Sequence, residues 1–321
     1  MKIKKNWLLV IILVAASTIF GVFSYFREYQ TLPEIAMRLM QENKTPAAGE
    51  TVIIFSPHPD DEVLGTGGFI KKSIDNGANV YVVLITNGDA HRLTTMEEFK
   101  SVRPDAEQYI QSGYNRQKES INALKILGLN EKNIIFLGYP DGGINSLFGK
   151  NWETKYLSPY TKTDSSPYNT SFQKEAPYTG QNLENNILEI LKKYQPTYVI
   201  MPNIKDINRD HSASGKFIEK ALIQYSKDGF QKPVAYSYLI HFRAFPKPKG
   251  RHPDRLLTPP NKLIEISDGW VKISLDEKTE NLKIKAINEY ISQLKSPTLK
   301  EVMESFIRKN ELLSETNFGN F

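Results

Sequence analysis

Apolar runs alternate with segments of helical period through the centre of the chain, and this alternation predicts its fold. Short runs rich in β-branched residues predict buried strands, at residues 51–56, 78–86, 133–137 and 198–201. Apolar residues at helical spacing predict helices between them, over residues 62–76, 105–127 and 182–194. Strands and helices that alternate in this way form right-handed βαβ units. The pattern therefore predicts an α/β fold with a Rossmann-like, mainly parallel sheet and flanking helices.

Two long polar segments, residues 89–105 and 144–179, interrupt this alternation and show no clear period, so we expect loops there. The first loop leaves the carboxyl end of a strand, where α/β sheets bind ligands. His91 in this loop is therefore a candidate substrate contact, with an ordinary surface histidine as the alternative. The second loop carries aromatic residues of the kind that stack on sugar rings, namely Trp152, Tyr156, Tyr160 and Tyr168.

The pattern changes in the last third of the chain. Residues 233–241 and 262–273 predict short strands with polar alternation, which we expect to form a small C-terminal β element covering the edge of the sheet. Residues 275–294 predict an amphipathic helix, and residues 300–310 predict a last one. We therefore expect a main domain over residues 50–295 and a C-terminal helical tail over residues 296–321.

The N-terminal pattern is different again, because residues 6–26 contain no charged side chain. Their length is close to the roughly 20 residues with which a helix crosses a bilayer. Three lysines precede this run, and positive charge on that side places the rest of the chain outside the cytoplasm. We expect residues 1–27 to be a transmembrane helix anchored in the lipid bilayer, followed by a linker over residues 28–49. A cleaved signal peptide and a secreted protein are the alternative, because residues 15–17 are small.

Composition changes this picture little. Hydrophobic residues make up 40% of the chain, which is ample for a packed core. The net charge of +5 is not gathered into one block, so we expect no nucleic-acid partner. The chain has no cysteine, which excludes disulfides and thiol chemistry and is compatible with export.

The candidate chemistry lies in the turn after the first strand, which holds His58, Asp60, Asp61 and Glu62. A helix N-terminus would explain one or two of these acids through capping and the helix dipole. Three carboxylates beside an imidazole repel one another, however, unless a cation lies among them. His58 and Asp61, three residues apart, can ligate one metal ion and leave Asp60 free as a general base.

A second candidate segment follows the predicted strand at residues 198–201 and contains Asp210 and His211. Parallel strands end at the same edge of a sheet, so we expect His211 beside His58 and Asp61. Two histidines and one carboxylate with an open position are typical of a catalytic zinc site. We therefore expect Zn²⁺ as the cofactor, with another divalent metal such as Fe²⁺ as the alternative.

The motif His58-Pro-Asp-Asp-Glu62, followed by Gly65-Thr-Gly-Gly68, resembles the signature of the PIG-L/LmbE-like family of zinc-dependent N-acetylglucosamine deacetylases. Weaker matches extend the similarity over residues 50–295: Thr86-Asn-Gly88, Arg116-x-x-Glu119, Gly138-Tyr-Pro-Asp141, Arg209-Asp-His211, Lys283-x-x-Ala286 and Tyr290-x-Ser-Gln293. The resemblance implies that Arg116 faces the substrate and that Asp141 helps to fix the sugar. From spacing alone, Arg116 and Glu119 could equally form an exposed ion pair, and Asp141 a turn.

The chain departs from the family pattern at Asn208, where the family usually has a histidine that stabilises the oxyanion or transfers a proton. An asparagine can donate a hydrogen bond to an oxyanion but cannot act as an acid. Either Asp60 carries the proton both ways or another histidine takes over. Of the remaining histidines, His241 at the end of an apolar run is the best placed.

Two functions remain open at this point. The first is a metal-dependent hydrolase that removes the N-acetyl group from N-acetylglucosamine-containing glycans or glycolipids outside the cytoplasmic membrane. In this interpretation Asp60 is the base and a zinc-bound water is the nucleophile. The alternative is a non-catalytic carbohydrate-binding surface protein that retains the fold, and Asn208 is the argument for it.

Overall fold

The computed structural model describes residues 2–26, 37, 39–260 and 269–318, and it divides into two units, residues 1–41 and 42–321. The first unit contains the helix α1 (Lys2–Phe26), where the sequence predicts one. The prediction that this helix spans a membrane is not supported. Among the helices of the described residues, none combines the length and the apolar character that crossing a bilayer requires. The predicted linker, residues 28–49, lies partly outside the described residues.

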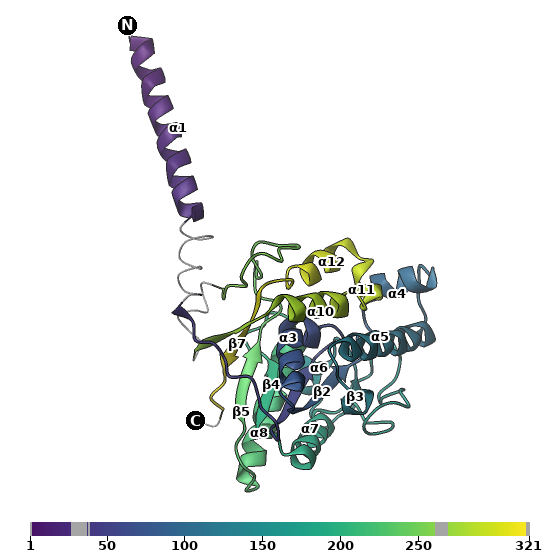
Figure 1. The fold of residues 1–321 in the computed structure, drawn as a ribbon. Coiled ribbons are helices and arrows are strands. Elements are labelled where there is room, and N and C mark those ends of the chain that lie inside the picture. The colour runs from purple at the N-terminus through teal and green to yellow at the C-terminus, as the bar shows by residue number, and fades with distance from the viewer. Residues whose placement is uncertain (1, 27–36, 38, 261–268, 319–321) are drawn as a thin grey trace. The chain divides into compact units, whose positions relative to one another are not determined.

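The second unit is built on one sheet, which has seven strands within the described residues, in the order β3-β2-β1-β4-β5-β7-β6 (Figure 1). Five strands run parallel: β1 (Thr51–Ser56), β2 (Asn79–Thr86), β3 (Ile134–Tyr139), β4 (Tyr198–Pro202) and β5 (Val234–Tyr238). The pairing of β1 with both β2 and β4 places the reversal of strand order between β1 and β4. In an open α/β sheet, ligands bind at the carboxyl ends of the strands beside such a point.

Helices cover both faces of the sheet, as expected. One face carries α6 (Ile144–Leu147), α7 (Gly180–Tyr194) and α8 (Arg209–Lys227), which pack on one another. Ile53 and Phe55 of β1 belong to the core cluster on this side. Val52 and Ile54 are also fully buried and point to the opposite face. There α10 (Glu277–Ile287) packs against α3 (Asp61–Asp75) and α5 (Ala106–Ile126).

Several predicted segments differ from the structure. Residues 89–105 are not a simple loop, because α4 (Arg92–Phe99) forms within them. This helix buries only Thr94 and Thr95, so it has no apolar stripe that could have predicted it. A short 3-10 turn, η2 (Glu131–Asn133), precedes β3. The helix predicted over residues 275–294 is α10 followed by a separate turn, α11 (Ile291–Leu294).

The predicted small C-terminal β element belongs to the main sheet, and the predicted helical tail contributes one strand to the same sheet. β5 pairs parallel with β4 and so extends that sheet. The tail contains α12 (Pro297–Glu304), but it continues into β7 (Asn310–Glu315), which lies antiparallel between β5 and β6 (Trp270–Ser274). β7 is polar in sequence, yet its first five residues are buried, which explains why periodicity missed it. Residues 262–268 of the predicted strand lie outside the described residues.

Candidate active site

The turn between β1 and α3 has an unusual backbone. Asp60 precedes the helix with φ 124° and ψ −37°, and its side chain does not cap the helix. A positive φ of this kind is strained for a residue with a Cβ, and such strain is concentrated at functional sites. The capping interpretation of Asp60 is therefore wrong. The carboxylate of Asp60 is therefore available for a role other than helix capping.

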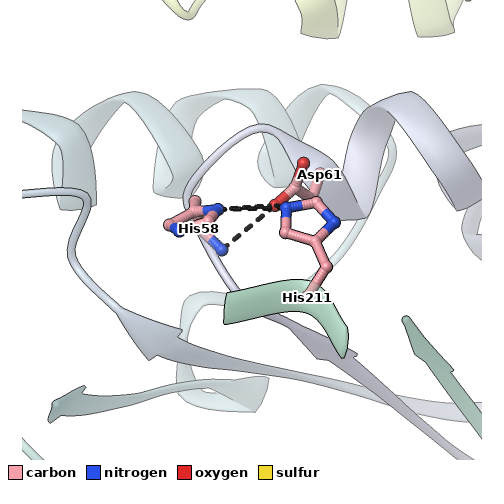
Figure 2. A group of neighbouring side chains, drawn as sticks. All are labelled: His58, Asp61 and His211. Atoms are coloured by element: carbon pink, nitrogen blue, oxygen red, sulfur yellow. Dashed lines mark hydrogen bonds and ion pairs between the residues drawn. The ribbon is translucent and has the colours of Figure 1, made fainter. Parts of the chain in front are cut away.

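Three potential ligand atoms converge above the sheet, as Figure 2 shows for His58, Asp61 and His211. His58 Nδ1 lies 3.1 Å from Asp61 Oδ2 and 3.2 Å from His211 Nε2, and His211 Nε2 lies 3.0 Å from Asp61 Oδ2. Ligands about 2.1 Å from a tetrahedral Zn²⁺ are roughly 3.4 Å apart, so a small outward movement would admit the ion. The donor set of two imidazoles and one carboxylate suits a catalytic divalent metal.

Carboxylates hold the other nitrogen of each imidazole. His211 Nδ1 lies 3.2 Å from Asp206 Oδ2, and His58 Nε2 lies 3.3 Å from Asp141 Oδ1. This arrangement keeps His211 Nε2 and His58 Nδ1 directed at the shared centre, as in many metal sites where a carboxylate orients a ligating histidine. Asp206 was not among the predicted site residues, and its position five residues before His211 at the same strand end was the only signal in the sequence.

A second group of ligand atoms lies on the other side of the His58 ring. It consists of His58 Nε2, Asp141 Oδ1 at 3.3 Å and Asp210 Oδ2 at 3.7 Å. Both carboxylates already accept backbone hydrogen bonds, Asp141 from Ala90 and Asp210 from Gly142. The first group has two imidazoles, each oriented by a carboxylate, and is therefore the better candidate for a zinc-like ion.

Nearby carboxylates raise the pKa of both imidazoles of this site. Burial alone would lower the pKa of His211, but Asp61 and Asp206 outweigh it and raise the pKa to about 9. Burial is likewise outweighed at His58, where Asp141, Asp210 and Asp61 raise the pKa well above its ordinary value. The pKa of Asp61 is lowered, because His211 and His58 overcome the effect of its burial. The carboxylates thus attract positive charge to the point that a cation would occupy.

Asp60 lies beside this centre and has a different environment. Burial and the neighbouring Asp61 carboxylate raise the pKa of Asp60 well above its ordinary value, although Arg116 opposes the shift. Arg116 Nη2 lies 3.3 Å from Asp60 Oδ2 and donates to the Pro59 carbonyl at 2.6 Å. Arg116 is only 3% exposed, so it is not the exposed partner of Glu119. Glu119 instead accepts two hydrogen bonds from Ser292.

Among the other candidate residues, His241 contacts a proposed metal ligand, whereas Asn208 and His91 cap helices. The His241 and His211 rings lie edge to face, with centroids 5.0 Å apart, and burial followed by His211 lowers the pKa of His241 to about 4. Asn208 caps α8, where its side-chain oxygen accepts the Asp210 amide at 2.9 Å. His91 caps α4 by accepting the Thr94 amide on Nδ1.

The aromatic residues of the long connection have different environments. Tyr168 is 1% exposed and donates to Asp89 at 2.5 Å, so it cannot stack on a sugar. The Trp152 ring stacks on Phe217, with Lys220 Nζ 4.1 Å from its centroid. The stacking prediction is therefore wrong for Tyr168 and untested for Tyr156 and Tyr160.

Comparison with known proteins adds family and fold. A family model described as PIG-L, GlcNAc-PI de-N-acetylase, matches residues 53–222. A search of curated proteins finds no match. A deacetylase in complex with bog, from the biosynthesis pathway of teicoplanin, is 15% identical with a TM-score of 0.53 over 84% of this chain and 99% of its own. A triple mutant of a deacetylase involved in teicoplanin biosynthesis is also 15% identical over the same shares, with a TM-score of 0.52.

A third solved structure is N,N'-diacetylchitobiose deacetylase from Pyrococcus horikoshii, bound to its inhibitor MPG. It is 19% identical, with a TM-score of 0.48 over 89% of this chain and 84% of its own. At these identities, the two teicoplanin-pathway structures show that the fold is shared.

Proposed function

Because this chain belongs to the PIG-L family of GlcNAc-PI de-N-acetylases, we propose that it removes the N-acetyl group from N-acetylglucosamine-containing glycans or glycolipids by metal-dependent hydrolysis. The observation that carries the proposal is the convergence of His58, Asp61 and His211 beside the strained Asp60. A family relationship alone suggests a substrate class. The site adds a cation position and a separate carboxylate, which amide hydrolysis requires.

The metal would be held by His58 Nδ1, Asp61 Oδ2 and His211 Nε2. When bound there, a divalent ion supplies Lewis acidity and lowers the pKa of a water toward about 7. Asp60 borders these atoms without being one of them, and it takes the proton of the attacking water. Its raised pKa also lets it return that proton to the leaving amine.

His241 lies beside the metal site, with its ring centroid 5.0 Å from that of His211. With a pKa lowered to about 4, the His241 imidazole is neutral at pH 7. A neutral imidazole can donate a hydrogen bond to the oxyanion but does not protonate an amine. Asn208 accepts the Asp210 amide with its side-chain oxygen as the cap of α8, which fixes the position of its amide group at the helix start. We therefore assign oxyanion stabilisation to His241 and both proton transfers to Asp60.

Substrate contacts by Arg116, Asp141 and His91 remain predictions, because each side chain already has protein partners. Arg116 binds Gly88 as well as the Asp60 turn, and Asp141 binds His58. In His91, only Nδ1 is used by the cap, which leaves Nε2 as a donor. A sugar hydroxyl that bound these side chains would do so in addition to their existing protein contacts.

The test is acetate release from N,N'-diacetylchitobiose by Asp60→Asn, with metal content measured on the same samples. General-base assistance is worth roughly 100- to 10,000-fold, so kcat should fall by about 100-fold or more while metal content stays unchanged. Asp105→Asn, at an exposed helix cap, is the matched control and should retain the wild-type rate. If Asp60→Asn loses metal in proportion to activity, Asp60 is a ligand instead.

Two outcomes with the wild-type chain separate the alternatives. Release of acetate supports the hydrolase. Binding of chitooligosaccharides without release of acetate, in protein loaded with zinc and then with Fe²⁺, would support the non-catalytic carbohydrate-binding protein. We also propose, from the three lysines that precede the uncharged run at residues 6–26, that the second unit lies outside the cytoplasm. In that case, protease added to intact cells should cleave it.

A further inference from the structure

The peptide bond between Pro59 and Asp60 is held at both of its polar ends. Arg116 Nη2 donates to the Pro59 carbonyl at 2.6 Å, and the Asp60 N–H donates to Glu62 Oε2 at 3.0 Å. The orientation of this peptide plane sets φ of Asp60, which is 124°. A non-glycine residue keeps such a φ only when its surroundings hold it there. These two contacts supply that constraint.

Glu62 is suited to this task because its carboxylate is completely buried and surrounded by donors. It is 0% exposed, and the Ser56 hydroxyl lies 3.0 Å from the same Oε2 that the Asp60 N–H contacts. Its other oxygen, Oε1, accepts the Tyr290 hydroxyl at 2.5 Å. Among the described residues, Glu62 belongs to neither group of atoms that could hold a metal ion. A carboxylate with protein donors on both oxygens is fixed in direction.

Tyr290 comes from a distant part of the chain. It precedes α11, 228 residues beyond Glu62, and its side chain is 0% exposed. A tyrosine hydroxyl that is buried needs a partner, and here the partner is an active-site carboxylate. The C-terminal region therefore reaches the turn that carries Asp60, through one hydrogen bond.

We propose that Glu62, braced by Tyr290, is a positioning residue that holds the Pro59–Asp60 peptide in the orientation that directs the Asp60 carboxylate to the metal site. This inference rests on the proposed function, in which Asp60 is the base. Glu62 touches neither substrate nor metal in this arrangement. Its effect on the rate is exerted through the backbone of Asp60.

The kinetic test compares Glu62→Ala, Glu62→Gln and Tyr290→Phe with wild type, using N,N'-diacetylchitobiose. Displacing a catalytic group by about 1 Å costs on the order of 100-fold, so Glu62→Ala should lower kcat by roughly 10- to 100-fold. KM and metal content should change by less than about two-fold, because neither ligand nor substrate contacts are removed. Glu62→Gln keeps an acceptor for the Asp60 N–H and should recover most of the rate. Tyr290→Phe should lie between wild type and Glu62→Ala.

The matched control is Glu311→Gln. Glu311 is also a buried carboxylate that accepts backbone N–H groups of α3, from Gly68 at 2.6 Å and Phe69 at 2.9 Å. If only the stability of α3 mattered, Glu311→Gln would reduce kcat as much as the variants of Glu62. We expect Glu311→Gln to lower the Tm and leave kcat within about two-fold. An equal loss of kcat in both would overturn the proposal.

Two further measurements separate positioning from general damage. In an Asp60→Asn background, Glu62→Ala should reduce kcat no further, because no base remains to be positioned. A reduction that multiplies with that of Asp60→Asn contradicts the proposal. In a crystal structure of Glu62→Ala, or of Tyr290→Phe if the former does not fold, we expect Asp60 to leave its positive φ or its carboxylate to shift. An Asp60 that keeps its conformation and carboxylate position would also overturn the proposal.

The crystallographic measurement keeps this inference distinct from the proposed function. If wild-type protein released no acetate from any N-acetylated substrate, the proposed function would fail. The conformation of Asp60 in the Glu62 variant would still decide whether Glu62 holds the turn.

Discussion

The amino-terminal turn and the middle of α3 bury carboxylates in opposite ways. In the middle of the helix, Glu311 accepts the Gly68 and Phe69 amides and pairs with Lys283 at 2.6 Å. Lys283 also donates to the Leu64 carbonyl at 2.9 Å, so one anion and one cation neutralise each other against an ordinary helix. At the amino-terminal turn, Asp61 contacts the imidazoles of His58 and His211, and the backbone at Asp60 is strained.

The difference indicates which buried charges serve the fold and which serve chemistry. A lysine and a glutamate that neutralise each other leave no position for a ligand. Carboxylates that lack such a partner raise the pKa of nearby imidazoles, as at His211, and so mark a position for a cation. The glycines of α3 fit the first role. A Cβ on Gly68 would lie 2.3 Å from Leu275 Cδ2 and 3.2 Å from Glu311 Oε1, so glycine lets these side chains approach the helix without being displaced.

The largest effect on activity should come from disrupting the proposed metal site. His211→Ala removes one of the converging ligand atoms and leaves Asp61 and Asp206 without the imidazole between them. A catalytic metal supplies several kcal/mol, so activity should fall by roughly 1,000-fold or more together with metal content. Chelation of the wild-type protein should have the same effect, reversed by added Zn²⁺. Full activity in metal-free protein would contradict the assignment.

Substitutions in the Lys283–Glu311 ion pair should change the free energy of unfolding and not the catalytic rate. Lys283→Met leaves Glu311 buried without its cation, which should cost roughly 3–5 kcal/mol of unfolding free energy. The double change Lys283→Met with Glu311→Leu removes both charges and should recover most of that loss. Urea denaturation measures the first effect, and kcat on N,N'-diacetylchitobiose should stay within about two-fold in the double variant. A large fall in kcat there would mean that the Lys283–Glu311 pair is coupled to the amino-terminal turn of α3.

Much of the amino-terminal end could be predicted because its signals are local. His58, Asp60 and Asp61 lie within four residues, directly after the strand Thr51–Ser56 that the apolar run predicts. The position of His211 followed from one rule, that parallel strands end at the same sheet edge. These inferences needed no knowledge of distant contacts.

The Lys283–Glu311 pair, and the residues that hold the site from outside, could not be predicted in this way. β7 is polar in sequence, and its Glu311 is buried only because Lys283 and two helix amides meet it there. Tyr290 reaches Glu62 across 228 residues, and no spacing reveals such a pair. Asp206 resembles the other polar residues of its turn until the structure shows its contacts with His211 and the His241 amide.

His241 lies beside the proposed metal site but is not one of the three converging ligands. Removing one oxyanion donor typically costs roughly 100- to 1,000-fold. We expect His241→Ala to reduce kcat by about 100-fold with metal content intact. His241→Gln keeps a donor and should retain more activity than the alanine variant. A wild-type rate in His241→Ala would mean that His241 has no catalytic role and that Asp60 is the only catalytic side chain of those proposed.

The smallest effect concerns Asp89, a buried carboxylate with neither a lysine nor an imidazole partner. It accepts the Tyr168 hydroxyl at 2.5 Å, and burial followed by Asp141 raises its pKa to about 7. At pH values between the ordinary pKa of an aspartate and about 7, the folded protein keeps a proton on Asp89 that the unfolded chain has released. The contribution of Asp89 to the free energy of unfolding therefore decreases as pH rises.

Asp89→Asn has no such proton, and its stability relative to wild type should therefore improve as pH increases. From pH 5 to 6.5 the improvement should be about 2 kcal/mol, at roughly 1.36 kcal/mol per pKa unit. Urea denaturation of both proteins at the two pH values measures the difference. A difference that does not change with pH would mean that Asp89 stays ionised, and that a buried carboxylate in this fold needs neither a bound cation nor a proton.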